Sequence, residues 1–177
     1  MKKLLLLLFF LPNLVLSETI ATCENPKGYE YYSFSGVVPE SGSGWDEGGF
    51  TGGTYRLTQA DNGDFDIIFT SKTGQFLSAR NDGGNVALFS IDENQVSFVV
   101  LYIGSVVETF SFRNNNAGKN ELMITQTKTM VIPKVAAYRA KCSQLDLYKI
   151  NLRKYSFYFC FFFPLLRIQI SMTVFGK

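Results

Sequence analysis

The chain has 177 residues, with 17 basic and 15 acidic side chains, three cysteines and no histidine. Residues 18–147 hold all 15 acidic residues and only ten of the basic ones, so this part carries a net charge of about −5. Nucleic-acid binding needs a basic surface, which this part lacks, so we expect no nucleic acid partner. The absence of histidine excludes Ser-His-Asp and Cys-His catalysis and the usual zinc sites.

The first 17 residues have the pattern of a secretory signal peptide. Lys2 and Lys3 precede an apolar run from Leu4 to Leu11, and compact residues near Ser17 suit cleavage. The run is shorter than the roughly 20 residues of a membrane-spanning helix. An uncleaved membrane anchor and a lipoprotein processed before Cys23 are the alternatives. We expect a secreted or periplasmic protein.

Cys23 and Cys142 lie near the two ends of the region that is expected to fold. An oxidising compartment favours a disulfide between them. Closing so long a loop removes about 4–5 kcal/mol of unfolded-chain entropy. We therefore predict one disulfide; Cys160 lies outside this region.

Residues 148–177 form a Phe-rich, basic tail without acidic residues. The tail shows neither strand alternation nor a helical stripe, and Pro164 and Arg167 interrupt its apolar run. It is expected to lie outside the domain at 18–147, either as sequence unrelated to the fold or as a membrane anchor. A membrane partner is otherwise not expected.

The middle of the chain predicts an all-β domain. Apolar runs rich in β-branched and aromatic residues alternate with turn signals such as Asn62-Gly63 and Asp82-Gly83. Short connections require antiparallel neighbours, which predicts an up-and-down meander of eight or nine strands in a closed or nearly closed barrel. A two-sheet sandwich is the alternative. The expected strands are 31–38, 54–59, 64–71, 75–80, 86–91, 96–103, 106–113 and 121–129. The Ala-rich segment 135–140 is expected to form a last short strand, with one or two helical turns as the alternative.

Eight segments of the sequence stand out as a set: Cys23–Tyr29, Phe34–Pro39, Gly44-Trp45, Thr51–Gly53, Asp66–Phe69, Ser78–Arg80, Asp82-Gly83 and Cys142. Together they resemble small secreted bacterial proteins of uncharacterised function. The meander also resembles calycin-type barrels in architecture. The likeness covers Cys23 to Leu145 and carries no catalytic motif, so it implies secretion and a β domain only.

The Gly-rich, acidic segment Ser41–Gly53 carries two aromatic residues, Trp45 and Phe50. Aromatic side chains on a loop can act as a binding lid. They can also fold back and close one end of the barrel as part of the core, which is the interpretation that we prefer here.

Glu108 is the candidate internal polar residue. Strand alternation places it on the same face as Val106, Phe110 and Phe112, and Arg80 shares a face with Phe76 in the same way. The two residues would then pair inside the barrel or anchor a polar group of a ligand. The simpler alternative is a β-bulge between Val107 and Thr109 that turns Glu108 outward.

We therefore expect a binding protein rather than an enzyme, with a small apolar ligand or an extracellular protein as its partner and no cofactor. The candidate binding residues are Glu108, Arg80, Trp45 and Phe50. An inhibitor of an extracellular hydrolase and a hydrolase that uses carboxylates alone are the alternatives. The acidic turn Asp61–Asp66 lacks the spacing of an EF-hand calcium loop, so we expect a solvated hairpin and no metal site.

Overall fold

The computed structural model describes residues 17–150, which form ten β-strands and two short 3-10 turns. The turns are Glu40–Gly42 and Leu147–Lys149. The strands are β1 (Ser17–Tyr32), β2 (Gly44–Gly49), β3 (Thr54–Ala60), β4 (Phe65–Thr70), β5 (Phe76–Ser78), β6 (Asn85–Ile91), β7 (Gln95–Tyr102), β8 (Val106–Asn114), β9 (Asn120–Lys128) and β10 (Lys134–Leu145).

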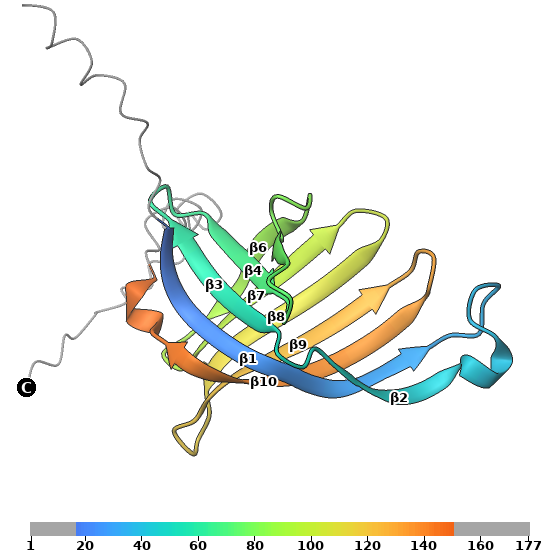
Figure 1. Cartoon of the computed structure of the whole chain (residues 1–177). Coiled ribbons are helices and arrows are strands. Elements are labelled where there is room, and N and C mark those ends of the chain that lie inside the picture. Colours follow the sequence, from blue (N-terminus) through green and yellow to red (C-terminus); the bar gives the residue numbers. More distant parts are fainter. Residues whose placement is uncertain (1–16, 151–177) are drawn as a thin grey trace, which may run out of the picture.

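All ten strands belong to one antiparallel sheet, which confirms the predicted all-β meander. The sheet runs in the order β5-β4-β3-β1-β10-β9-β8-β7-β6, and β2 pairs with β1 beside this path. The first and last strands of the chain, β1 and β10, are neighbours within the sheet. The sheet curls around a concave interior (Figure 1). Within the described residues, β5 and β6 remain as two edges, so the sheet forms a curled half-barrel rather than a closed ring.

Strand β1 differs most from the prediction. Only Tyr31 and Tyr32 of the expected strand 31–38 belong to it, and the strand extends back to Ser17. Asn25-Pro26-Lys27-Gly28 has the composition of a turn, but these residues lie at a register shift between β1 and β10, where Asn25 has a φ of 53°. The bulge absorbs the turn-forming residues, and the strand continues on both sides.

A disulfide joins the two central strands, as predicted. Cys23 of β1 and Cys142 of β10 are directly paired residues and their sulfur atoms are bonded. Gly28 pairs with Tyr138, four residues from Cys142 along β10, and lies so close to this strand that a Cβ on Gly28 would be 1.8 Å from the carbonyl oxygen of Ala137. The close contact requires glycine at this position.

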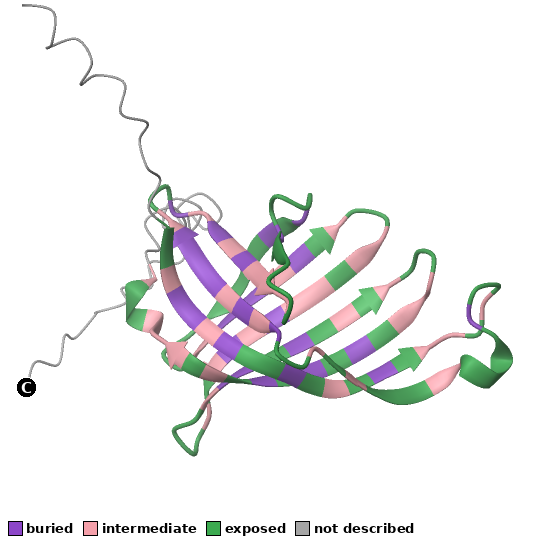
Figure 2. Cartoon of the chain, viewed as in Figure 1, coloured by how far each residue is buried: buried purple, intermediate pink, exposed green. Residues whose placement is uncertain are grey.

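Inward-facing residues of β7, β8, β9 and β10 form four successive cross-strand rungs. All eight side chains of the two rungs nearest one end are apolar and buried. Figure 2 shows buried positions in purple along the strands of the sheet. These rungs are Val96–Phe112–Leu122–Ala140 and Phe98–Phe110–Ile124–Tyr138. With Ile20, Leu57 and Phe65 from β1, β3 and β4, they make the core.

Two residues that follow the expected domain boundary at Leu147 contact the folded region. Ile150 packs against the core, and Lys149 Nζ lies 3.1 Å from the Glu18 carboxylate. None of the helical segments in residues 17–150 is long and apolar enough to cross a bilayer. Residues 1–16 of the predicted signal peptide (1–17) and the tail from 151 onward lie outside the described residues, whereas Ser17 begins β1.

Candidate functional site

The other two rungs lie at the opposite end of the sheet, where six of their eight residues line a cavity of about 710 Å³. The first is Val100–Glu108–Gln126–Ala136, and the outermost is Tyr102–Val106–Lys128–Lys134. The same alternation that fills the core therefore directs polar side chains inward here. The hairpins β7–β8 and β9–β10 end beside the cavity, so it opens at this end (Figure 1).

The cavity walls are mainly aromatic and aliphatic. A cavity of this size falls in the range of roughly 300–1,000 Å³ that is typical of small-molecule sites, and such sites combine apolar walls with a few polar groups. The apolar lining residues are Phe50, Tyr55, Ile67, Phe69, Leu77, Ala79, Val106, Phe110, Met130 and Val131.

Glu108 lies on the inward face of β8 and lines the cavity. The pairing of β7 with β8 runs from Tyr102–Val106 to Gln95–Arg113 without a register shift, so the bulge expected around Glu108 is absent. Gln126 Nε2 donates a hydrogen bond of 2.5 Å to Glu108 Oε1. Burial raises the pKa of the Glu108 carboxyl, and the hydrogen bond from Gln126 and the charge of Lys134 offset only part of this effect.

Gln126 leaves one polar atom without a partner. Its side-chain Oε1 is buried and accepts no hydrogen bond from any described residue. Rotating the amide would turn Oε1 toward the Glu108 carboxylate, so the interaction with Glu108 fixes its orientation. Buried carbonyl oxygens without a partner are uncommon and costly.

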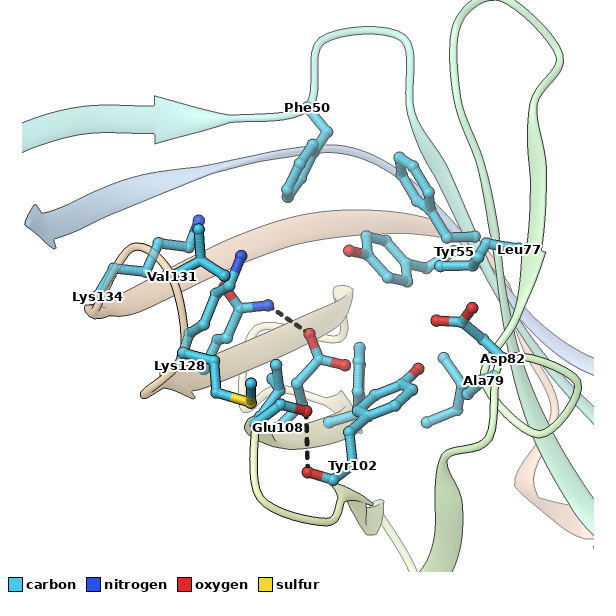
Figure 3. Close-up of a pocket in the computed structure, with 17 residues that line it drawn as sticks. Phe50, Tyr55, Leu77, Ala79, Asp82, Tyr102, Glu108, Lys128, Val131 and Lys134 are labelled. Carbon is cyan, nitrogen blue, oxygen red and sulfur yellow. Dashed lines mark hydrogen bonds between the residues drawn. The ribbon is translucent and has the colours of Figure 1, made fainter. Parts of the chain in front are cut away.

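Two phenols and a second carboxylate complete the polar part of the cavity. Figure 3 shows Tyr55, Tyr102, Asp82 and Glu108 pointing into the same space. Burial and the charges of Glu108 and Asp82 raise the pKa of Tyr102 to about 12. Burial and the charge of Glu108 also raise the pKa of Tyr55. Both phenols therefore stay neutral and can donate or accept hydrogen bonds.

Lys128 and Lys134 lie one rung nearer the opening than Glu108. Lys134 Nζ is 3.4 Å from the Glu30 carboxylate and 3.4 Å from the Tyr138 hydroxyl. Glu30 also accepts hydrogen bonds from Tyr138 and Tyr32. Burial opposes the ionised form of Glu30, but these hydrogen bonds and Lys134 outweigh it, so the pKa of Glu30 is lowered. Glu30 is thus an ionised partner of Lys134.

The two aromatic residues of Ser41–Gly53 have different environments. Phe50 lines the cavity and packs edge-on against Phe69, with ring centroids 5.4 Å apart. Trp45 is 68% exposed and packs against Tyr31, so its predicted place inside the barrel is wrong. The reason is that Gly44–Gly49 is strand β2 rather than a loop, and its alternation places Trp45 on the outer face with Tyr31.

Arg80 does not reach Glu108, so the predicted internal pair is wrong. Its guanidinium donates to the carbonyl oxygens of Phe65 and Val86 and lies 3.8 Å from the Asp64 carboxylate. Strand β5 ends at Ser78, two residues before Arg80. The alternation that placed Arg80 inside therefore stops too early to apply to it.

The acidic turn 61–66 is held by local contacts. Asn62 donates its side-chain N–H to Asp64 at 2.9 Å, and Asp66 accepts the backbone N–H of Arg80 at 3.2 Å. Across residues 17–150, no group of three or more acidic or cysteine side chains is arranged to hold a metal ion.

The sequence analysis named only Glu108 and Phe50 among the cavity residues as candidates for binding, and it missed Gln126, Asp82 and Tyr102 among others. Tyr102 shares its parity with Val96, Phe98 and Val100, so alternation alone would have found it. Gln126 needed the β8–β9 register, which places it opposite Glu108. Asp82 lies in the turn between β5 and β6, and no periodicity describes such a residue.

No protein-family model matches the chain, and comparison with curated proteins and with solved structures finds no significant match. The functional argument therefore depends on the cavity itself.

Proposed function

We propose that this chain is a secreted binding protein that holds a small, largely apolar ligand inside its curled sheet. The observation that carries the proposal is the cavity of about 710 Å³, because a filled interior would have left only the outer surface for binding. Its apolar walls supply the affinity, and the rung of Glu108 and Gln126 supplies polar contacts.

Secretion is part of the proposal. The N-terminal pattern around Lys2 and Leu4–Leu11 is that of a signal peptide, and a Cys23–Cys142 disulfide suits an oxidising compartment. The resemblance to small secreted bacterial proteins and to calycin-type barrels agrees with this assignment.

Uptake of N-phenyl-1-naphthylamine tests the proposal, because this neutral probe becomes fluorescent in an apolar environment. We expect saturable uptake by the protein. Val106 lines the cavity, so Val106→Phe should reduce uptake at least about tenfold by filling the space. Val107→Phe is the matched control: Val107 is the next residue of β8 and is 45% exposed on the outer face. Equal uptake by the two variants would show that the probe binds elsewhere.

A hydrolase that uses two carboxylates is the second candidate, because Asp82 and Glu108 both line the cavity. The apolar walls offer few hydrogen-bonding groups to a sugar, so we prefer the binding function. Release of nitrophenol from nitrophenyl glycosides by the protein, and its loss in Glu108→Gln, would instead establish the hydrolase.

A further inference from the structure

The cavity separates hydrogen-bond acceptors from positive charge by depth. Glu108 and Gln126 occupy the deeper rung, and Lys128 and Lys134 occupy the rung at the opening. Successive inward-facing residues of a strand are about 7 Å apart. A ligand that enters head first therefore brings its polar group past the lysines to a carboxylate and an amide.

The deeper rung is short of donors. Glu108 receives one hydrogen bond from a side chain, that of Gln126, and among the described residues no basic side chain lies within 4 Å of its carboxylate. Gln126 Oε1 accepts no hydrogen bond at all from the described chain. A partly buried carboxylate without a cationic partner and a buried carbonyl without a donor both carry a free-energy cost that a suitable ligand would reduce.

We propose that the cavity selects amphipathic organic cations, with an ammonium head between Glu108 and Gln126 and an apolar body against the aromatic walls. This inference rests on the proposed ligand-binding function. An ammonium has three N–H donors and no acceptor, which matches the carboxylate oxygens and Gln126 Oε1. A carboxylate head would instead face Glu108 and leave Gln126 Oε1 without a donor.

The two lysines at the opening of the cavity, Lys128 and Lys134, oppose the binding of a cation. Lys134 is already held by Glu30 at 3.4 Å, so much of its charge is neutralised. Lys128 has no acidic side chain within 4 Å in the part of the chain described. Asp82 adds a second negative charge to the cavity wall. The fixed charges next to the apolar walls therefore favour a cation.

Displacement of N-phenyl-1-naphthylamine by three compounds with the same eight-carbon chain tests the inference at pH 7. The compounds are octylamine, 1-octanol and octanoate. Octylamine should displace the probe at a concentration about tenfold or more below that of octanol, since charge-assisted hydrogen bonds are stronger than neutral ones. Octanoate should be the weakest. Isothermal titration with octylamine checks direct binding if the probe is not taken up.

Glu108→Gln should remove the advantage of octylamine and leave octanol nearly unchanged. Glu93→Gln is the control, because it removes the same charge from an exposed turn between β6 and β7. If Glu108→Gln does not fold, the order in which the three octyl compounds displace the probe from the unaltered protein still tests the inference.

Each alternative outcome has a distinct meaning. Equal displacement by all three compounds, or preference for octanoate, would overturn the selection of cations and leave the binding function intact. Preference for octanoate would assign head-group recognition to Lys128 and Lys134. If neither the probe nor any octyl compound binds, the proposed function itself is wrong.

Discussion

The two ends of the curled sheet have the same backbone pairing but different interiors. On β8, Phe110 and Phe112 face inward at the filled end, and Val106 and Glu108 face inward at the hollow end. The difference between the two interiors comes from the side chains. Large apolar groups interdigitate at the filled end, whereas small and polar groups leave a cavity at the hollow end. The filled end thus forms the core, and the hollow end holds the cavity that we propose as the ligand site.

Matched truncations of valine test this division most directly. Val96 is fully buried in the filled end, so Val96→Ala should lower the free energy of unfolding by about 2 kcal/mol through lost burial and a new cavity. Val106→Ala only enlarges an existing cavity and should cost about 1 kcal/mol or less. Urea denaturation of both variants gives the two values. Equal losses would mean that the hollow end is packed in solution.

Alternation along single strands predicted the filled end well. The expected strands at 96–103, 106–113 and 121–129 differ from β7, β8 and β9 by at most one residue at each end. These strands are antiparallel neighbours joined by short turns, and their inward residues are apolar over several positions. The local sequence pattern and the tertiary packing agree in these strands, so the sequence was sufficient to predict their position.

The hollow end depends on information that the sequence does not show locally. The parity of Glu108 was correct, but its partner Gln126 follows only from the register between β8 and β9. Trp45 was misplaced because β2 is rich in glycine and acidic residues, which are uncommon in strands. Its pairing with the long strand β1 overrides that local preference.

The pH dependence of stability tests whether the Glu108 carboxyl at the hollow end is buried. Burial raises the pKa of Glu108 above its ordinary value of 4.5, so the folded protein holds this proton more tightly than the unfolded chain does. The resulting stabilisation is complete below the unfolded-state pKa and is lost as the pH rises through the folded-state pKa.

Glu108→Gln removes this titration and leaves Asp82, Lys128 and Lys134 in place. The variant should therefore gain stability relative to the parent as the pH rises from about 4 to 7, and the difference should be smallest at the acidic end. Thermal or urea unfolding of both proteins across this range measures it. A difference that is constant with pH would mean that the Glu108 carboxyl is solvated and its pKa unperturbed.

The smallest expected effect concerns the hairpin at the opening of the cavity. Val131 has a φ of 60°, and the backbone N–H of Ile132 donates to the carbonyl oxygen of Met130 at 2.7 Å, which makes a tight three-residue turn. A left-handed conformation costs a residue with a side chain about 1–2 kcal/mol, and the cost is greater for a β-branched one.

Val131→Gly should therefore stabilise the protein by about 0.5–1 kcal/mol, because relief of this strain exceeds the added entropy of glycine in the unfolded chain. Little packing is lost, since Val131 is 73% exposed. Val135→Gly is the control: it lies within β10, where its φ is not positive, and should destabilise by about 0.5–1 kcal/mol. Urea midpoints separate the two. If Val131→Gly destabilises the protein as much as Val135→Gly does, the hairpin holds no strain, and the filled and hollow ends differ only in their side chains.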